Sequence, residues 1–167
     1  MFSYLIELIE HDLVMLEPLV ISANLNSLKT VANYIIKIGD LAQLHPQLTY
    51  KLRLAVDELA TNIINYAYPD GEEKGKMMIE AAISSENVTV SIIDQGFPFD
   101  PRTKLQKETQ LLNQPLEKRP VGSLGILLVI NEVDEFVYER IDDQNINTLI
   151  INRTQATEMG NNQENMF

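Results

Sequence analysis

The spacing of hydrophobic residues divides the first half of the chain into expected elements. Residues 15–22 carry the apolar bulk of a strand. From residue 28 to about residue 40, apolar side chains recur every three or four positions, which predicts a helix. A longer helix is expected over 47–68, because the Tyr68-Pro-Asp-Gly71 sequence that follows has the composition of a turn.

The second half of the chain alternates between apolar and polar residues with a period of two. Residues 77–83 and 88–93 alternate in this way, and a short polar linker joins them, which predicts an antiparallel hairpin. A third helix is expected over 122–132, and a final pair of strands over 133–140 and 145–152. Hairpin-paired strands mixed with helices predict an α+β fold, a two-layer sandwich of a mostly antiparallel sheet and one helical layer.

The length of 167 residues fits one domain, and 45% hydrophobic residues are enough for one core. We expect this domain to cover 15–153, after an N-terminal extension over 1–14. The polar tail, 154–167, has the composition of a disordered segment. Residues 102–121 are polar and weakly periodic, and a connection of that length is typical of a lid or binding loop.

The charge of the chain restricts its partners. A net charge of -11 repels phosphate backbones and anionic membrane surfaces, so neither nucleic acid nor a membrane is an expected partner. No apolar run approaches the roughly 20 residues that span a bilayer, and the acidic start does not resemble a signal peptide. The chain has no cysteine, which excludes disulfides and thiolate metal sites. We therefore expect a cytoplasmic protein.

The first segment with candidate chemistry lies on the second expected helix. Glu58 and Asn62 are four residues apart, so their side chains share one helix face. The Asn oxygen is a hard ligand suited to Mg²⁺, and the Glu carboxylate can accept a proton from a hydroxyl or a water. Taken alone, such a pair is also common on solvated helix faces.

The second segment follows the strand expected over 88–93. Asp94 comes at the end of this strand, where a carboxylate that is partly buried must find hydrogen-bond donors. The exocyclic amino group of adenine is one such donor. Gly96 has no Cβ, so a ligand can approach the backbone closely there. An Asx turn at a strand end accounts for the same residues equally well.

The third segment, Arg119-Pro-Val-Gly122-Ser-Leu124-Gly125, opens an apolar helix. Free N–H groups at the beginning of a helix bind anions, and the cation of Arg119 can add charge-assisted contacts. A flexible loop with a glycine for close packing is the alternative interpretation of this segment taken alone.

In this order and context, the three segments resemble the ATP-binding (Bergerat-type) fold shared by gyrase, the heat-shock chaperone, histidine kinases and the MutL mismatch-repair protein, the GHKL superfamily. Within it, the chain most resembles the bacterial anti-sigma factor serine-protein kinases. The similar stretches are LRLAVDELATNIINYAYPDG, SIIDQGFPFDP and RPVGSLGILLVINEVDEFVYER. The resemblance extends over about 16–153.

The resemblance also implies roles for single residues. Glu58 matches the general base, Asn62 the Mg²⁺ ligand, and Asp94 the aspartate that recognises adenine, with Gly96 beside it. The other positions that it assigns to nucleotide binding are Arg119, Gly122, Leu124, Gly125 and, on the last strand near the adenine, Thr148. The chain departs from the family pattern at Pro98, where many members have a second glycine, and at Tyr66, where relatives often have His.

The function implied by the resemblance is that of a protein serine/threonine kinase that uses ATP and Mg²⁺. Its substrate would be an anti-sigma-factor antagonist, and it would sequester a sigma factor by partner switching, with a homodimer as one possible state. Two alternatives stay open. A nucleotide-gated binding module with little or no phosphoryl transfer would use the same residues. A detached histidine-kinase catalytic domain would have the same fold, but the sequence shows no long dimerisation helix that bears a phosphoacceptor histidine.

Overall fold

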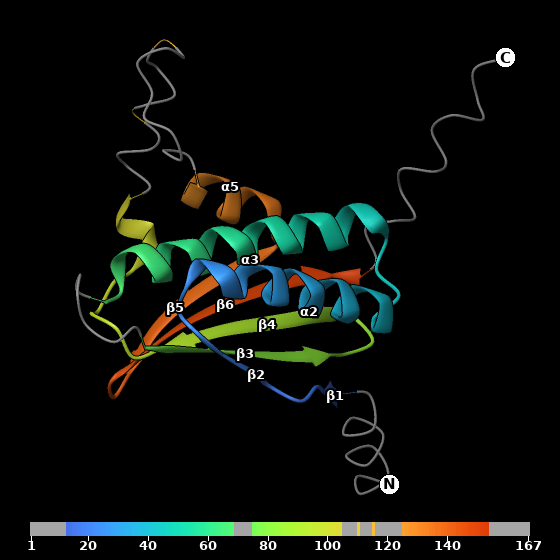
Figure 1. Ribbon diagram of the computed structural model, residues 1–167. Helices are drawn as coiled ribbons and strands as arrows, with labels where there is room; N and C mark the ends of the chain where they lie inside the picture. Colours follow the sequence, from blue (N-terminus) through green and yellow to red (C-terminus); the bar gives the residue numbers. More distant parts are fainter. Residues whose placement is uncertain (1–12, 69–74, 105–109, 111–114, 116–124, 154–167) are drawn as a thin grey trace, which may run out of the picture.

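The fold is built on a six-stranded antiparallel sheet with helices against one of its faces (Figure 1). The computed structural model describes residues 13–68, 75–104, 110, 115 and 125–153. The strands run in the order β1-β3-β4-β6-β5, and β2 also pairs with β3. Their bounds are β1 Val14–Met15, β2 Leu19–Ser22, β3 Lys76–Ile83, β4 Asn87–Asp94, β5 Glu135–Ile141 and β6 Gln144–Asn152. The predicted α+β sandwich is thereby confirmed.

Among the described residues, three α-helices form the helical layer (Figure 1). Their bounds, with those of two 3-10 turns, are η1 Leu25–Ser27, α2 Leu28–Leu41, α3 Pro46–Tyr66, η2 Pro101–Lys104 and α5 Gly125–Glu132. The long helix α3 begins with proline at a position where no N–H is needed, and His45 Nδ1 accepts a hydrogen bond from the Gln47 amide at 3.3 Å. None of the described helices is both long and apolar enough to cross a membrane.

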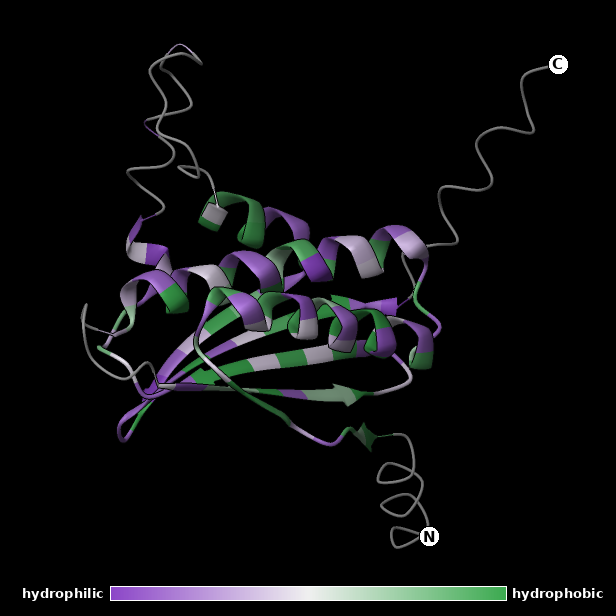
Figure 2. Ribbon diagram, viewed as in Figure 1, coloured by the Kyte–Doolittle hydropathy of each residue, from purple (hydrophilic) through white to green (hydrophobic). Residues whose placement is uncertain are grey.

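The core lies between the sheet and the helices, because every second residue of the central strands points toward α2 and α3. Strand β4 buries Val88, Val90 and Ile92 in this way, and the apolar faces of the helices cover them (Figure 2). Strand β6 follows the same alternation, but its two inward positions near Asp94 are Asn145 and Asn147. The core therefore becomes polar at one end of the sheet.

Several expected boundaries shift by a few residues. The strand expected over 15–22 is two strands, β1 and β2, with Leu16, Glu17 and Pro18 between them, because proline has no N–H to donate to a ladder. Val14, expected in the N-terminal extension, already pairs with Ile83 of β3. Residues 1–12, the tail over 154–167 and most of the expected lid over 102–121 lie outside the described residues.

Helices α2 and α3 approach closely at Gly39, which is buried in their contact. A Cβ added at Gly39 would overlap both Oγ1 and Cγ2 of Thr49, so no rotamer of the threonine would remove the collision. The glycine is therefore a packing requirement, even though glycine inside a helix is otherwise unfavourable.

This contact generates a stability prediction. Gly39→Ala should lower the free energy of unfolding by about 1–2 kcal/mol, because overpacking of about 1–3 kcal/mol exceeds a gain in helix propensity of about 1 kcal/mol. The check is urea unfolding of the wild type, Gly39→Ala, Thr49→Ala and the double variant. Since Thr49→Ala removes the two overlapping atoms, Gly39→Ala should not lower the free energy of unfolding in that background. Equal destabilisation in both backgrounds would contradict the packing explanation.

Candidate functional site

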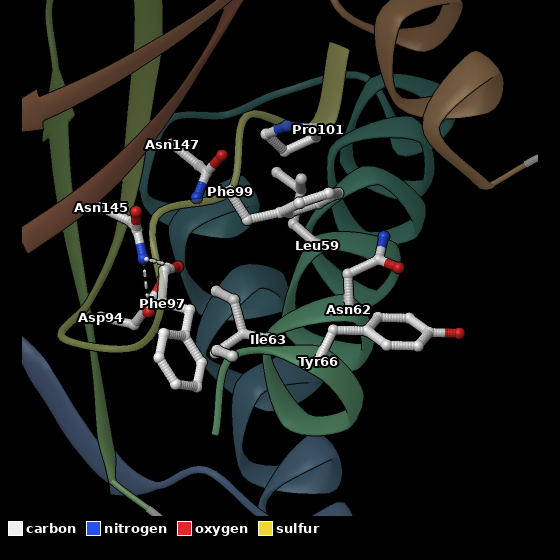
Figure 3. Close-up of a pocket in the computed structure, with 11 residues that line it drawn as sticks. Leu59, Asn62, Ile63, Tyr66, Asp94, Phe97, Phe99, Pro101, Asn145 and Asn147 are labelled. Atoms are coloured by element: carbon white, nitrogen blue, oxygen red, sulfur yellow. Dashed lines mark hydrogen bonds between the residues drawn. The ribbon is translucent and has the colours of Figure 1, made fainter. Parts of the chain in front are cut away.

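A pocket lies between α3 and the polar end of the sheet (Figure 3). Its walls come from three places: helix α3, the ends of β4 and β6, and the loop that leaves β4. The lining residues are Leu59, Asn62, Ile63, Tyr66, Ala67, Asp94, Phe97, Phe99, Pro101, Asn145 and Asn147. Mostly apolar walls with a few fixed polar groups are typical of a small-molecule site.

Asp94 is the buried carboxylate of this pocket. Its side chain is at the end of β4 and the residue is only 2% exposed. The carboxylate oxygen Oδ1 accepts hydrogen bonds from the Gly96 amide at 2.8 Å and from Asn145 Nδ2 at 2.9 Å. Both bonds go to Oδ1, and among the described residues no donor binds Oδ2. The second oxygen can therefore accept a hydrogen bond from a ligand.

Asn145 ties this carboxylate to the loop after β4. Besides Asp94, its Nδ2 donates to the Phe97 carbonyl at 3.1 Å, while its Oδ1 accepts from the Tyr138 hydroxyl at 2.9 Å. Arg140 Nη1 donates to the Gly96 carbonyl at 3.1 Å. Side chains of β5 and β6 thus fix the backbone on which the carboxylate depends.

Gly96 is required because this loop passes directly over the end of α3. A Cβ at Gly96 would overlap the carbonyl oxygen of Ala67, the C-cap residue of α3. The Phe97 amide donates to the same carbonyl at 2.9 Å. Only glycine lets the backbone come this close, so Gly96 joins the loop to the helix and keeps Asp94 at the pocket.

Burial raises the pKa of the Asp94 carboxyl above its ordinary value. Hydrogen bonds from Asn145 and Gly96 and the charge of Arg140 oppose this rise but do not cancel it. An ionised Asp94 is therefore costly in the ligand-free protein, and a donor supplied by a ligand would lower that cost.

Helix α3 presents the other polar wall. Asn62 lines the pocket directly, and Glu58 lies one turn earlier on the same helix. A Cβ on Gly125 would overlap Glu58 Oε2, so the carboxylate lies against the beginning of α5. The structure thus places Glu58 beside Gly125 and brings Asn62 and Asp94 to one pocket. Arg119, Gly122 and Leu124 lie outside the described residues.

Thr148 is not at this pocket. Side chains alternate along β6, and Thr148 is on the sheet face opposite the helices, where its hydroxyl lies 2.9 Å from that of Ser91. The positions of β6 that line the pocket are Asn145 and Asn147. The signal for them was present in the sequence, since two Asn residues occupy positions that the apolar alternation of the strand assigns to the core.

A lysine and two aromatic rings lie at the edge of the pocket. Lys104 Nζ is 4.0 Å from the centroid of the Tyr66 ring and 4.9 Å from that of Phe99. These are cation–π distances, so the two rings position the ammonium group. Nearby, Arg102 is paired with Asp100 at 2.8 Å. Neither Lys104 nor Phe99 was singled out by the sequence motifs.

Comparison with known proteins agrees with this arrangement. The family model described as histidine kinase-like ATPase domain matches residues 21–152. The serine-protein kinase RsbW of Oceanobacillus iheyensis is 34% identical over 86 residues, which is 50% of this chain and 53% of the relative. The RsbW of Bacillus velezensis is 31% identical over 85 residues, which is 50% of this chain and 52% of the relative. The chain therefore spans about half the length of the curated relatives it matches.

A solved structure shows the same fold. The crystal structure of the RsbU and RsbW domains of Rv1364c from Mycobacterium tuberculosis superposes with a TM-score of 0.55. Its sequence identity is 19%, and the match covers 81% of this chain and 32% of that chain. At this identity the likeness concerns the fold alone.

The raised pKa of Asp94 predicts how ligand-free stability depends on pH. The folded-state pKa lies above the unfolded value, so the stabilisation from protonated Asp94 is complete below about pH 4 and is lost as pH rises through the folded pKa. Asp94→Asn has no carboxyl group to ionise at this position. Its free energy of unfolding should therefore rise relative to that of the wild type as pH increases. Urea unfolding between pH 4 and pH 8 measures the difference.

The matched control is Asp40→Asn, which removes the same charge from an exposed side chain of α2. Its stability relative to the wild type should change little over the same pH range. A wild-type advantage over Asp94→Asn that grows with pH would show that the ionised carboxylate is well stabilised, contrary to this interpretation.

Proposed function

This chain belongs to the histidine kinase-like ATPase domain family, and from that premise we propose that it is an ATP-dependent protein kinase acting in the cytoplasm. It would bind MgATP in the pocket of Figure 3 and phosphorylate a serine or threonine of an anti-sigma-factor antagonist. When the antagonist is phosphorylated, the chain would hold a sigma factor instead. The observation that carries the proposal is that Asp94 of the sheet and Asn62 of α3 line one pocket.

Asp94 would bind the base. Its Oδ2 would accept a hydrogen bond from the exocyclic amino group of adenine, while the Gly96 amide and Asn145 hold Oδ1. The apolar side chains of Ile63 and Phe97 flank this position and offer surface to a planar ring. Guanine has a carbonyl where adenine has its amino group, so a carboxylate at this point disfavours it.

Asn62 would bind the metal. Its carboxamide oxygen is a hard ligand of the kind that Mg²⁺ accepts, and Mg²⁺ usually keeps phosphate and water ligands besides one or two from the protein. The described residues contain no cluster of three His, Cys, Asp or Glu side chains that could hold a metal alone. A single protein ligand beside a triphosphate therefore fits the site. The bound ion would neutralise charge on the phosphates.

A chain with a net charge of -11 needs local features to bind a triphosphate. Lys104 supplies a cation beside the pocket residues Tyr66 and Phe99. The beginning of α5 at Gly125 lies against the Glu58 carboxylate, an anion of the kind that N–H groups at helix ends favour. Lys104 supports a phosphate position along α3, between the base and Glu58.

Glu58 would act as the general base. Its carboxylate would take the proton of the incoming serine or threonine hydroxyl while that oxygen forms a bond to the γ-phosphorus. The bond between the γ-phosphorus and the bridging oxygen would break, and ADP would leave. In phosphoryl transfer, positioning and electrostatic stabilisation supply most of the catalysis. The names of the RsbW relatives support the kinase assignment. The substrate and the partner are those that the resemblance to the anti-sigma factor kinases implies.

Two substitutions on α3 test the proposal, because they should separate binding from transfer. Glu58→Gln keeps the shape of the side chain but removes the base, so ATP affinity should stay nearly unchanged while transfer falls by about 10²–10⁴-fold. Asn62→Ala removes the metal ligand, so binding of MgATP should weaken and transfer should fall with it. The measurements are calorimetric titration with MgATP and radiolabel transfer from ATP to antagonist candidates purified by capture on the immobilised chain.

Glu86→Gln is the matched control, because this exposed glutamate lies at the opposite end of β4 from Asp94. It should bind and transfer like the wild type. If Glu58→Gln transfers as fast as the wild type, Glu58 is not the base. If the wild type binds ATP but labels none of the captured proteins, the nucleotide-gated binding module becomes the better description.

A further inference from the structure

The sheet face opposite the helices, here called the outer face, carries an apolar patch. The register makes four apolar side chains neighbours across β2, β3, β4 and β6: Val20, Met78, Ile93 and Ile146. Val20 is 56% exposed, and Ile93 is buried by its neighbours without being part of the hydrophobic core. Among the described residues, no helix lies on this face (Figure 1). Apolar patches of this kind commonly mark a contact surface.

The N-terminal segment, residues 1–12, joins the sheet at the edge of this face. Residue 12 is followed by Leu13 and then by β1, an edge strand whose Met15 points to the outer face beside Ala82. Leu13 and Met15 are both more than half exposed. The segment itself lies outside the described residues. Because it is tethered next to the patch, its effective concentration there is on the order of millimolar.

The sequence of this segment has the pattern of an amphipathic helix. Apolar residues recur with the spacing i, i+3, i+4 and i+7, and they are Phe2, Leu5, Ile6 and Ile9. Tyr4 and Leu8 widen this apolar face, and Leu13 continues it toward β1. The other face carries the polar residues Ser3, Glu7, Glu10 and His11. A helix of this kind is stable only when its apolar face is covered.

The length of the segment matches the distance to the patch. From Ala82, beside Met15, to Met78 the chain runs about 13 Å along β3. Crossing from β1 over β3 to β4 adds two strand spacings of about 4.8 Å each, so the diagonal path to Ile93 is about 16 Å. A helix formed by residues 1–12 would be about 18 Å long and would therefore reach the patch.

The charge of the segment restricts what its apolar face can contact. Residues 1–12 contain no lysine or arginine, and the polar face carries Glu7 and Glu10. Helices that lie on membranes use basic polar faces to meet anionic headgroups, so a membrane surface does not fit this segment. Against the outer face of the sheet, the same two glutamates would point to solvent.

We infer that residues 1–12 form an amphipathic helix that docks on the outer face of the sheet of the same chain. Leu5 and Ile9 pack toward the apolar patch, and Glu7 faces solvent. The sheet is then covered on both faces. The patch is on the side of the sheet away from the nucleotide pocket, so the contact can be tested without a nucleotide.

Cross-linking tests the contact in the full chain, which has no cysteine of its own. Ser91 of β4 is two residues from Ile93 on the outer face, and Ser91→Cys introduces a thiol there with little change in size. This substitution is combined with Leu5→Cys or, as the matched control, with Glu7→Cys. A short bismaleimide should join the two thiols within one chain about tenfold faster in the Leu5→Cys pair, because Glu7 points away from the sheet in the docked helix.

Urea unfolding gives a second, independent measurement. Leu5→Ser should lower the urea midpoint, because it removes apolar area from the contact, whereas Glu7→Ser should leave the midpoint unchanged. Met78→Ser removes the opposite side of the same contact. In that background Leu5→Ser should lower the midpoint less than it does in the wild type, since residues that touch are energetically coupled.

Each result decides for or against the docked helix. Faster cross-linking of the Leu5→Cys pair within one chain, together with coupled losses of stability, would establish it. Equal rates for the two pairs, or an unchanged midpoint in Leu5→Ser, would overturn it. A covalent dimer as the main product at low protein concentration would also overturn it, because the segment would then cover the sheet of a second copy.

Discussion

The arrangement of the site depends on one buried carboxylate. Asp94 is held at the end of β4 by the Gly96 amide and by Asn145, and Gly96 in turn requires direct contact with the carbonyl of Ala67 at the end of α3. Sheet, loop and helix thus meet at one charged group, which is costly to bury and has one oxygen left for a ligand. A ligand that donates a hydrogen bond to the second oxygen would offset this cost, and for this reason we propose the polar end of the otherwise apolar core as the binding end.

The two walls of the pocket divide the chemistry between them. The sheet wall, with Asp94 and the Asn residues of β6, carries the polar groups suited to a nucleobase. The helix wall carries Glu58 and Asn62 on one face of α3, where groups suited to a metal and a proton lie one turn apart. In the proposed function, helix α3, which packs against the face of the sheet, therefore sets the distance between base recognition and phosphate chemistry, without any long loop among the described residues (Figure 1).

The sequence predicted the layers well, because the hydrophobic period is strong in α3, β3 and β4. It also pointed to Glu58, Asn62, Asp94 and Gly96, since each comes at a helix face or strand end that pattern alone can locate. Thr148 is on the sheet face away from the helices, and the motif could not show this because it gives the strand but not which of its two faces meets the helices. Lys104 and Phe99 could not be foreseen, since their contact with Tyr66 depends on how the chain folds back after β4.

The central claim is that Asp94 makes this pocket a site for adenine nucleotides, and calorimetric titration of the wild type with MgATP and MgGTP tests it most directly. The carboxylate accepts from the amino group of adenine but faces the carbonyl of guanine, and a mismatched polar group in a site built for hydrogen bonding is strongly rejected. The account predicts binding of ATP with GTP at least tenfold weaker, a difference of about 1.4 kcal/mol or more. Equal affinity for the two nucleotides, or none for ATP, would contradict it.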